Sequence, residues 1–455
     1  MANPLPPALH LTKDDIESAE QRAKYVIAVI GCSQKAVLAA IAFAEAGFKV
    51  KCADADQSIT RRFSKGNMKL GNREAEAKLK SFVRTEQVIA SSDLKTVVTS
   101  SDIIVLTIDT KVDEKKAADY SEAESICKQV GAILPKSSLF IYAGAGGFGF
   151  TEGVAKTNLE NTSGLKAGID FGLVYSPLCI LIRQQTMQTR PMELVVAADD
   201  KSSLDSGALI LETIVKQGVT RTLGTKTAEL ATLFSAVTKD SNTAMVNELA
   251  TFCEAAGVDC FDVLRLMRTN DREVPLLPTI SDENNRNEAY MLLENAENIN
   301  AKLRLPSLAR QVNEDMIRHA INLMQDAMRS NGKPLRRARV ALLGASLDSD
   351  SAHSAFVAML EAKGAKVNFY DPYGVNSEQT EGPAVKKTLN EATEGTDCVV
   401  VLSEQDQLKR LNLKKLHALM KSPAAFVDLT SQFERAKVEE AGFTYRGLGR
   451  GIWKK

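Results

Sequence analysis

Apolar positions along this chain fall into short uninterrupted runs that alternate with stretches of helical spacing, a pattern typical of an α/β protein. Residues 25–31, YVIAVIG, make a run of strand length that ends at a glycine. Residues 35–47 then place apolar side chains at helical spacing, and FKVKCADAD supplies the next strand. Strand, glycine turn, helix and strand in this order form a βαβ unit, so we expect a doubly wound parallel sheet.

Strand-length runs recur along the chain. Three follow the first unit, at Thr96–Val98, Ile103–Thr107 and Leu139–Ala143. The whole pattern returns after Ala338, where RVALLGASL indicates a strand and turn, HSAFVAMLEAKG a helix and KVNFYDP another strand. Two more runs, Asp397–Ser403 and Ala424–Thr430, complete the set. The sequence therefore predicts a second open sheet near the C-terminus.

The middle of the chain has a helical pattern instead. Residues 224–268 keep apolar side chains at helical spacing over far more than about 25 positions, interrupted at Gly257. Residues 287–330 continue the pattern with an interruption near Pro306. We expect one long helix, a shorter helix after it, and further helices up to the second sheet.

The predicted fold class is α/β, with two doubly wound Rossmann-like domains joined by a helical segment built on a long central helix. At 455 residues the chain is long enough for two or three cores of ordinary size. The predicted boundaries are a polar leader at 1–24, an N-terminal Rossmann-like dinucleotide-binding domain at 25–223, a central helical domain at 224–335 and a C-terminal Rossmann-like domain at 336–455.

Charge and hydropathy narrow the classes of partner. Lys plus Arg and Asp plus Glu number 57 each, so no net field attracts nucleic acid or an anionic membrane. The longest apolar runs, such as residues 26–31 and 103–108, fall far short of the roughly 20 residues that span a bilayer. The N-terminus has no apolar signal core behind a basic start, so we expect a cytoplasmic protein without nucleic-acid or membrane partners.

Cysteine and histidine usage gives no sign of a disulfide framework or of a metal site. The seven cysteines show no CxxC pairing, and the four histidines are dispersed without metal-ligand spacing. We expect most of the cysteines to be small buried apolar residues.

The turn after the first strand, GCSQKA, is a candidate phosphate-binding turn. A dinucleotide fingerprint places glycines where the backbone approaches the pyrophosphate at a helix N-terminus. Gly31 is present, Ser33 stands at the close-approach position, and Ala36 is an accepted third residue. Asp54 follows the next strand, where an acid can bind a ribose hydroxyl, which favours NAD over NADP. The alternative is that these are ordinary turn residues of an α/β sheet.

The order of several segments resembles the nucleotide-sugar dehydrogenases, the family of UDP-glucose and UDP-N-acetylmannosamine dehydrogenases. The matching segments are IAVIG and AEAGFKVKCADAD, SDIIVLTIDT at the usual VPTP strand, GIDFGLVYSP at the usual SPE segment, TAEL and NELATFCEAAGVD, VNFYDP, and GFTYRGLGRG. The resemblance implies an NAD-binding lobe that includes Thr110, a dimerising central helix, and a C-terminal lobe for the nucleotide of a UDP-sugar. A homodimer is implied as well.

The resemblance also implies chemistry whose residues differ in this chain. The family oxidises a UDP-sugar primary alcohol twice through a cysteine of a GGxC motif, but the corresponding PTISDENNRNEAYMLL has no cysteine. Thr232 and Ala236 stand where the family has a lysine and an asparagine, and Leu178 replaces the acid of SPE. Two further segments differ from the family pattern: AGAGGFG at residues 143–149 and LGASLDSDSAHS in the C-terminal lobe.

Three features keep alternative interpretations. Cys179 is either a displaced nucleophile or a buried structural cysteine, and AGAGGFG is either an anion-binding nest or a tightly turned loop. The apolar positions of the central helix fit either a homodimer face or packing within the chain, and they are Leu230, Leu233, Val237, Met245 and Leu249.

Two functions follow as hypotheses. The first is NAD-dependent oxidation of a UDP-sugar to a uronate, carried out ancestrally and here with a degraded active site. The second is a non-catalytic or regulatory paralogue that keeps the fold and binds a nucleotide or a nucleotide sugar, or dimerises.

Overall fold

The computed structural model describes residues 6–70, 72–113, 115–178, 193–215, 217–270, 277–280, 285–344, 352–372 and 385–451. The chain divides into two compact units. Unit 1 comprises Met1–Ser235 and Tyr290–Ala301, and unit 2 comprises Ala236–Ala289 and Lys302–Lys455.

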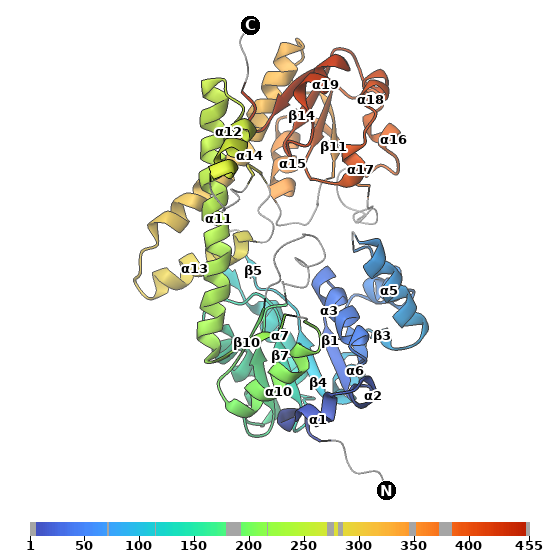
Figure 1. Cartoon of the computed structure of the whole chain (residues 1–455), viewed down its shortest axis with the longest axis vertical. Helices are drawn as coiled ribbons and strands as arrows, with labels where there is room; N and C mark the ends of the chain where they lie inside the picture. Colours follow the sequence, from blue (N-terminus) through green and yellow to red (C-terminus); the bar gives the residue numbers. More distant parts are fainter. Residues whose placement is uncertain are drawn as a thin grey trace. The chain divides into compact units, whose positions relative to one another are not determined.

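Unit 1 is built on an eight-stranded sheet of order β10-β9-β8-β7-β4-β1-β2-β3, shown in blue to green in Figure 1. All neighbouring strands run parallel except β8 and β9, which are antiparallel. The strands are β1 (Val26–Ile30), β2 (Lys49–Ala53), β3 (Val88–Ser91), β4 (Ile103–Leu106), β7 (Leu139–Tyr142), β8 (Gly172–Tyr175), β9 (Leu194–Ala198) and β10 (Val219–Leu223).

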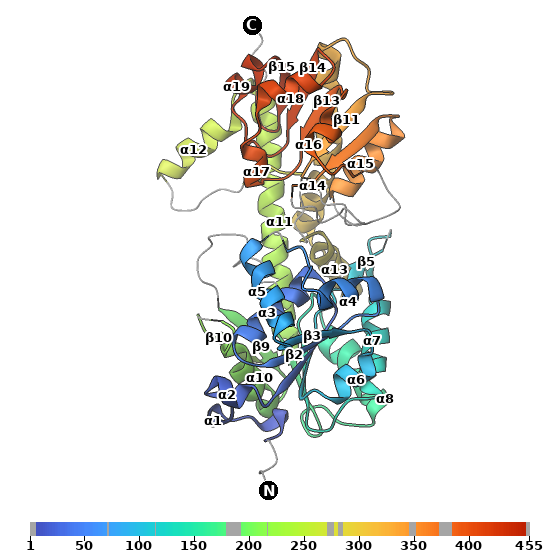
Figure 2. The same ribbon diagram turned by 90° about the vertical axis from the view of Figure 1, so that its right-hand side faces the viewer.

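Helices cover both faces of this sheet, as Figure 2 shows, so its central strands are buried on both sides. This double burial explains why the central strands are uninterrupted apolar runs. The covering helices are α3 (Gln34–Glu45), α4 (Gln57–Ser64), α5 (Arg73–Arg84), α6 (Leu94–Thr99), α7 (Ser121–Gly131), α8 (Thr157–Ser163) and α10 (Lys201–Glu212), with the π-helical turn η2 (Thr151–Lys156) before α8 and a small hairpin of β5 (Lys111–Val112) and β6 (Ala118–Asp119).

The predicted polar leader is packed against this domain. It forms three short helical segments, η1 (Ala8–His10), α1 (Lys13–Ile16) and α2 (Ala19–Arg22). Leu9 is buried, and its backbone N–H donates to the carbonyl of Ser137 at 3.2 Å. The Ser206 hydroxyl donates to the Leu9 carbonyl at 2.9 Å, which ties the leader to α10.

The predicted strand at Thr96–Val98 is wrong, because these residues lie in α6. Asp93 caps this helix by accepting a hydrogen bond from the Thr96 N–H at 3.2 Å. A local cap and tertiary packing thus override the β propensity of the threonine and valine residues. The strand that pairs with β2 is β3, a few residues earlier.

The helical middle follows the predicted pattern closely. The long helix α11 (Thr225–Ala256) ends before Gly257, and α12 (Cys260–Asn270) follows. Helix α13 (Asn285–Asn298) and helix α14 (Arg304–Ser330) are separated by a short break, and Pro306 lies in the first turn of α14, where its missing N–H costs no intrahelical bond.

Unit 2 contains a five-stranded parallel sheet of order β12-β11-β13-β14-β15. This is the second open sheet that the sequence predicts, extended by β15. Its strands are β11 (Arg339–Leu343), β12 (Lys366–Tyr370), β13 (Cys398–Val401), β14 (Ala424–Asp428) and β15 (Phe443–Gly447), and its helices are α15 (Ala352–Ala362), α16 (Leu389–Thr393), α17 (Asp406–Lys409), α18 (Leu413–Leu419) and α19 (Arg435–Glu440).

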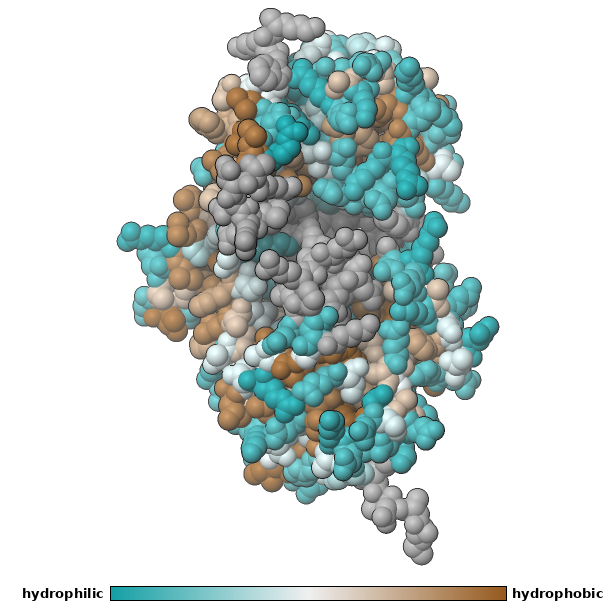
Figure 3. Space-filling model, in the orientation of Figure 1, coloured by the Kyte–Doolittle hydropathy of each residue, from teal (hydrophilic) through white to brown (hydrophobic). Residues whose placement is uncertain are grey.

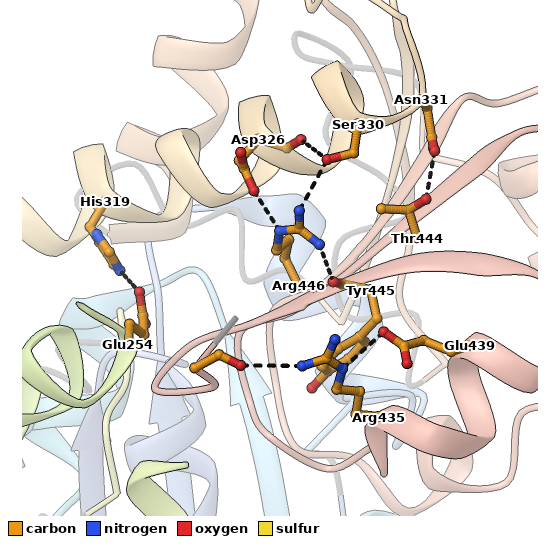
Figure 4. Close-up of polar contacts among 11 residues, drawn as sticks. Glu254, His319, Asp326, Ser330, Asn331, Arg435, Glu439, Thr444, Tyr445 and Arg446 are labelled. Atoms are coloured by element: carbon orange, nitrogen blue, oxygen red, sulfur yellow. Dashed lines mark hydrogen bonds and ion pairs between the residues drawn. The ribbon is translucent and has the colours of Figure 1, made fainter. Parts of the chain in front are cut away.

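Polar contacts attach β15 to the C-terminal end of α14, as Figure 4 shows. The Arg446 guanidinium donates to Asp326 at 2.5 Å and to the Ser330 hydroxyl at 3.0 Å. Near α11, Glu254 accepts from the Gly449 N–H at 2.6 Å and lies 2.8 Å from His319 Nε2. These bonds fix the edge of the sheet against the two long helices of unit 2.

None of the helices in the described part of the chain combines the length and the apolar character that a bilayer crossing requires.

Candidate functional site

The candidate site lies in unit 1 at the carboxyl ends of β1 and β4. The chain leaves β1 towards β2 and β3 on one side and later places β4 on the other, so these two strands form the topological switch point of the sheet. Ligands of open α/β sheets bind in the crevice outside this point.

Gly31 makes the turn that leads out of β1. It has a φ of 101°, and a Cβ there would lie 3.0 Å from the Thr107 hydroxyl, so a glycine is needed for both conformation and space. Its N–H donates to the Ala53 carbonyl at 2.8 Å. The turn thus has the tight geometry of a phosphate-binding turn at its first glycine.

Ser33 begins α3 and uses its own side chain as a cap. Its hydroxyl accepts a long hydrogen bond of 3.4 Å from the N–H of Ala36. In a phosphate-binding turn this helix end faces the pyrophosphate. The serine hydroxyl therefore occupies one of the amide donors that a bound phosphate would use.

Asp54 lies at the end of β2, where the sequence places the ribose-binding acid. One carboxylate oxygen accepts from the Cys32 N–H at 2.9 Å, and the other accepts from the Asp56 N–H at 2.9 Å. The side chain is half-exposed, and each oxygen keeps a second lone pair for a hydroxyl donor. The acid is held in place and still fits a ribose.

An ion pair that the sequence did not reveal lies at the same crevice. Lys35, in the first turn of α3, pairs with Asp109, which follows β4; the lysine side chain is 7% exposed and the aspartate side chain 51%. The same Asp109 oxygen accepts from the Ala145 N–H at 2.7 Å. The pair therefore links the first turn of α3 to the loops after β4 and β7.

Thr110, the threonine that the resemblance implies in the cofactor site, is buried beside this pair. Its N–H donates to the Ala145 carbonyl at 2.9 Å. The structure thus places Gly31, Asp54 and Thr110 around the ends of adjacent strands, with Ser33 and Ala36 at the start of α3.

The glycine-rich segment 143–149 is a tightly packed loop. A Cβ at Gly144 would lie 2.1 Å from the Ile108 carbonyl oxygen, and one at Gly147 would lie 2.2 Å from the Tyr120 hydroxyl. The N–H of Phe148 donates to the side-chain oxygen of Asn295 at 2.9 Å. Close packing explains the glycines here.

Glu229 of α11 accepts hydrogen bonds from the backbone amides at the end of this loop. It is fully buried and accepts from the N–H groups of Gly149 and Thr151 at 2.6 and 2.7 Å. Burial raises the pKa of the Glu229 carboxyl, against the lowering effect of these hydrogen bonds. A protein carboxylate occupies amides that an anion-binding nest would need, so the tightly turned loop is the interpretation that the structure supports.

The six cysteines of the described ranges are buried, as the sequence predicts. Desolvation raises the pKa of the thiols of Cys32, Cys127 and Cys260 to about 12. Such thiols are not activated nucleophiles. Cys179 lies outside the described residues. No group of three or more His, Cys, Asp or Glu side chains within the described ranges could hold a metal ion.

Two residues that the resemblance assigns to catalytic positions of the family have structural contacts in unit 1. Leu178 is fully buried in the main core, and its N–H is 3.3 Å from the Ala143 carbonyl. The Thr232 hydroxyl donates to the Ala228 carbonyl of its own helix at 3.0 Å and accepts from the Tyr175 hydroxyl at 3.2 Å. Neither residue offers a charged group.

Two further positions fall in unit 2. Ala236, which the resemblance assigns to the family asparagine position, is buried. The resemblance assigns the cysteine motif of the family to the segment 278–293, in which residues 278–280 precede α13 and Ile280 is buried in the core of unit 2. Residues 281–284 lie outside the described residues.

Fold and crevice together define a dinucleotide-binding α/β protein, because a glycine turn, a helix N-terminus and a β2 acid converge at a switch point. Family models for the three domains of the UDP-glucose/GDP-mannose dehydrogenase family match most of the chain: the NAD binding domain at 25–214, the central domain at 226–315 and the UDP binding domain at 349–435. The chain belongs to this family. Its N-terminal domain is therefore the family's NAD binding domain.

Two of the similar relatives are distant in sequence and match along nearly their whole length. The chain is 24% identical to the UDP-N-acetyl-D-mannosamine dehydrogenase of Pyrococcus horikoshii over 437 residues, which covers 93% of this chain and 99% of the relative. It is 22% identical to a UDP-glucose 6-dehydrogenase of Rhizobium meliloti, with the same two coverages. A solved structure of the Pyrococcus horikoshii enzyme matches the fold with a TM-score of 0.77, 23% identity, and coverage of 94% and 99%.

Proposed function

We propose that this protein binds NAD and a UDP-sugar but does not carry out the two-step oxidation of its family. The observation that carries the proposal is Leu178. Where the resemblance implies a carboxylate beside the sugar, this chain places an apolar side chain in the core of unit 1. A residue so buried cannot bind or deprotonate a substrate group.

The remaining family positions support the same conclusion. Two-step oxidation of an alcohol through a covalent adduct needs a thiolate, and charged groups that stabilise the developing oxyanion. Thr232 and Ala236 are uncharged, and the described cysteines are buried. The function is therefore that of a non-catalytic member that retains cofactor and substrate binding.

Cofactor binding is supported by the chain's own residues. Gly31 and the first turn of α3 would receive the pyrophosphate, and Asp54 would bind the adenosine ribose. NAD supplies a hydride acceptor when it is bound. The half-exposed Asp54 carboxylate would repel a 2′-phosphate, so NAD is favoured over NADP.

Calorimetry and a turnover assay test the proposal together. We expect the purified chain to bind NAD, and to bind UDP-N-acetylmannosamine or UDP-glucose, while producing no NADH above background. The Pyrococcus horikoshii relative, assayed in parallel, is the positive control for each step. Sustained NADH formation by this chain, abolished by Cys179→Ala, would show instead that a displaced nucleophile performs the family reaction.

We further infer a homodimer formed through α11. The structure divides the predicted apolar stripe: Leu233 and Val237 are buried within the chain, whereas Met245 and Leu249 are exposed. Apolar side chains also gather on the left side of the surface in Figure 3, over α12 to α14. The exposed apolar residues of α11 lie at helical spacing and are Phe234 (55%), Met245 (57%), Leu249 (46%) and Phe252 (70%).

A charge on this stripe tests the dimer. We expect Leu249→Glu combined with Phe252→Glu to convert a dimer into a monomer by light scattering. Ala77→Glu combined with Ser81→Glu adds the same charge at two exposed positions of another helix, α5, and is the matched control that should leave the dimer intact. A monomeric wild-type protein at micromolar concentration would contradict the inference.

A further inference from the structure

Helices α4 and α5, with the loop between them, concentrate positive charge in a chain that is neutral as a whole. Residues 57–84 contain eight lysine or arginine residues and two glutamates, which is a net charge of +6. Because the acidic and basic residues of the whole chain balance, the remainder carries a net charge of −6. The excess of positive charge therefore belongs to this part of unit 1 alone.

Three of these cations lie on one face of α5, the helix labelled at the right of Figure 1. Arg73, Lys80 and Arg84 are exposed and stand seven and four residues apart, so they fall within a narrow arc of the helix. Ala77 and Ser81, also exposed, occupy the positions between them. The face is therefore a row of long cations separated by small side chains.

The loop after α4 brings a fourth cation next to this row. Gly66 has a φ of 63°, and a Cβ there would lie 2.8 Å from the Cα of Lys80 and 3.2 Å from its Cβ. The loop therefore touches α5 at Lys80, and the exposed Lys65 directly precedes Gly66. We call Lys65, Arg73, Lys80 and Arg84 the basic stripe.

No acidic side chain in the described part of the chain forms an ion pair with the basic stripe. The two glutamates of residues 57–84 have other partners: Glu74 pairs with Lys78 at 2.9 Å, and Glu76 accepts from the Leu70 N–H at 2.8 Å. Lys78 also pairs with Glu45 at 2.7 Å. The available carboxylates thus neutralise a lysine outside the stripe and leave the stripe charged.

The positions of these charges do not serve the helix itself. Arg73 is the first residue of α5, where the helix dipole favours an anion over a cation. Lys80 and Arg84 are one turn apart, a spacing at which like charges repel each other. Of the three α5 cations only Arg84, in the last turn, is well placed for the dipole. An anionic partner would relieve the repulsion within the stripe.

The side chains around the stripe select the kind of anionic partner. Ala77 and Ser81 offer no aromatic ring on which a base could stack, as single-stranded nucleic acid requires. Leu79, Phe82 and Val83 belong to the core of unit 1 or pack against it, so α5 has no large apolar side chains free to insert into a bilayer. A narrow row of long cations, two of them arginines whose planar forks match carboxylates, fits a row of carboxylates.

We propose that the basic stripe docks an acidic segment of a partner protein, in which Asp or Glu side chains repeat at helical spacing. An antiparallel helix with carboxylates separated by four and then seven residues places one carboxylate opposite each cation of α5. This docking surface is independent of the NAD and UDP-sugar binding proposed above.

Fluorescence anisotropy of the full chain with a labelled synthetic peptide tests the docking. The peptide repeats glutamate at the spacing of the stripe and has alanine elsewhere. We expect binding at low ionic strength that weakens steeply as salt is added, because exposed ion pairs are screened. The same peptide with glutamine in place of glutamate should not bind. Absence of binding by the glutamate peptide at low ionic strength would overturn the proposal.

Charge reversal identifies the surface that binds. We expect Arg73→Glu combined with Arg84→Glu to weaken peptide binding about tenfold or more, where tenfold is about 1.4 kcal/mol. Lys13→Glu combined with Lys201→Glu changes the net charge equally, at exposed positions of α1 and α10, and should leave the affinity nearly unchanged. Equal losses in the two double variants would mean that net charge, and not the stripe, attracts the peptide.

Ala77→Glu combined with Ser81→Glu keeps every cation and supplies carboxylates from the helix itself. The new side chains lie one turn from Arg73, Lys80 and Arg84, so they should block peptide binding while leaving the melting temperature unchanged or higher. Thermal unfolding confirms that the variant is folded. Peptide affinity equal to that of the wild type in this variant would contradict the assignment.

The same variants distinguish other occupants. Tighter binding of random-sequence duplex DNA or of phosphatidylserine vesicles than of the peptide, lost on reversal of Arg73 and Arg84, would rule out a protein partner as the occupant. Self-association that the reversal removes would make a second copy of the chain the occupant and would also count against the proposal. NAD affinity should be unchanged in every stripe variant, so a failure to bind NAD would count against the proposed function alone.

Discussion

Single residues at the switch point of unit 1 change what the cofactor crevice offers. Ser33 fills part of the helix N-terminus with its own hydroxyl, and Lys35 places a nearly buried ammonium next to it. Asp109 neutralises that ammonium and holds the Ala145 amide. The crevice therefore carries a fixed ion pair beside the phosphate-binding turn.

Ser33→Gly should tighten NAD binding, by about threefold to tenfold. The substitution frees the Ala36 N–H for a phosphate oxygen and removes bulk at the close-approach position. Replacing a serine cap by glycine costs only a few tenths of a kcal/mol, so the fold should persist. Calorimetry with NAD measures the change, and Ser18→Gly, at the cap of α2, is the control. Unchanged or weaker NAD binding would mean that the serine does not obstruct the site.

Asp109→Ala should destabilise the protein by about 1–3 kcal/mol, because it leaves the buried Lys35 ammonium without its partner. Lys35→Met removes the buried ammonium, so that no counter-charge is needed at Asp109. Lys35→Met combined with Asp109→Ala should therefore be less destabilising than Asp109→Ala alone. Urea unfolding of the three variants gives the comparison. If the double variant shows the sum of the two single losses, the pair is not coupled.

Glu229 predicts a pH dependence with a definite sign. Its pKa is raised by burial, so the folded protein holds this proton to a higher pH than the unfolded chain does. The stability it contributes is complete below the ordinary carboxyl pKa and is lost as pH rises through the raised folded pKa. The unfolding free energy of the wild type minus that of Glu229→Gln should therefore fall as pH rises through that range. A difference that grows with pH would give the group the opposite shift.

At the scale of elements, α11 serves different purposes along its length. In unit 1 it presents Glu229 to the loop after β7. In unit 2 its Asp240 forms a buried ion pair with Arg310 of α14 at 2.6 Å, and Asn313 donates to the same carboxylate at 2.9 Å. This polar network helps to fix the register of the two long helices, which the Asn247–Asn313 and Glu254–His319 hydrogen bonds also join.

Asp240→Asn should cost about 1–3 kcal/mol of stability, because it removes the charge from a buried carboxylate that accepts hydrogen bonds from Arg310 and Asn313. Asp315→Asn breaks an exposed ion pair with Arg318 on α14 and should cost no more than about 1 kcal/mol. Thermal and urea unfolding measure both. Similar losses in the two variants would show that the Asp240 pair is effectively solvated.

At the scale of the whole molecule, the protein combines balanced charge with exposed apolar surface. The chain has 57 basic and 57 acidic residues and an isoelectric point of about 6.9. With no net charge to keep copies apart, apolar contact between them is opposed least near neutral pH.

We therefore expect solubility to pass through a minimum close to pH 7 and to recover on either side. Static light scattering across the pH range measures this directly. Leu249→Glu combined with Phe252→Glu should make the minimum shallower, since it removes part of the apolar surface. A solubility that changes in one direction only across this range would contradict the argument.

The sequence supported some parts of the candidate site better than others. Gly31 and Asp54 were predicted because a turn and a strand end constrain their residue types locally. Lys35 and Glu229 were not, because their partners Asp109 and Thr151 lie 74 and 78 residues away. The available signal for Lys35 was a lysine inside an otherwise apolar helix. No local sequence pattern predicts the role of Glu229.

By itself the sequence determined the α/β class, the two open sheets, the long central helix and the family, since these depend on periodicity, on turn residues and on the order of segments. Only the tertiary structure decided that Thr96–Val98 is helical, that Leu233 and Val237 face inward while Met245 and Leu249 do not, and that a glycine-rich loop is filled by its own chain. The physical reason is common to all three. Each depends on which distant surface covers a residue, and a helical or strand period specifies a face without naming what packs against it.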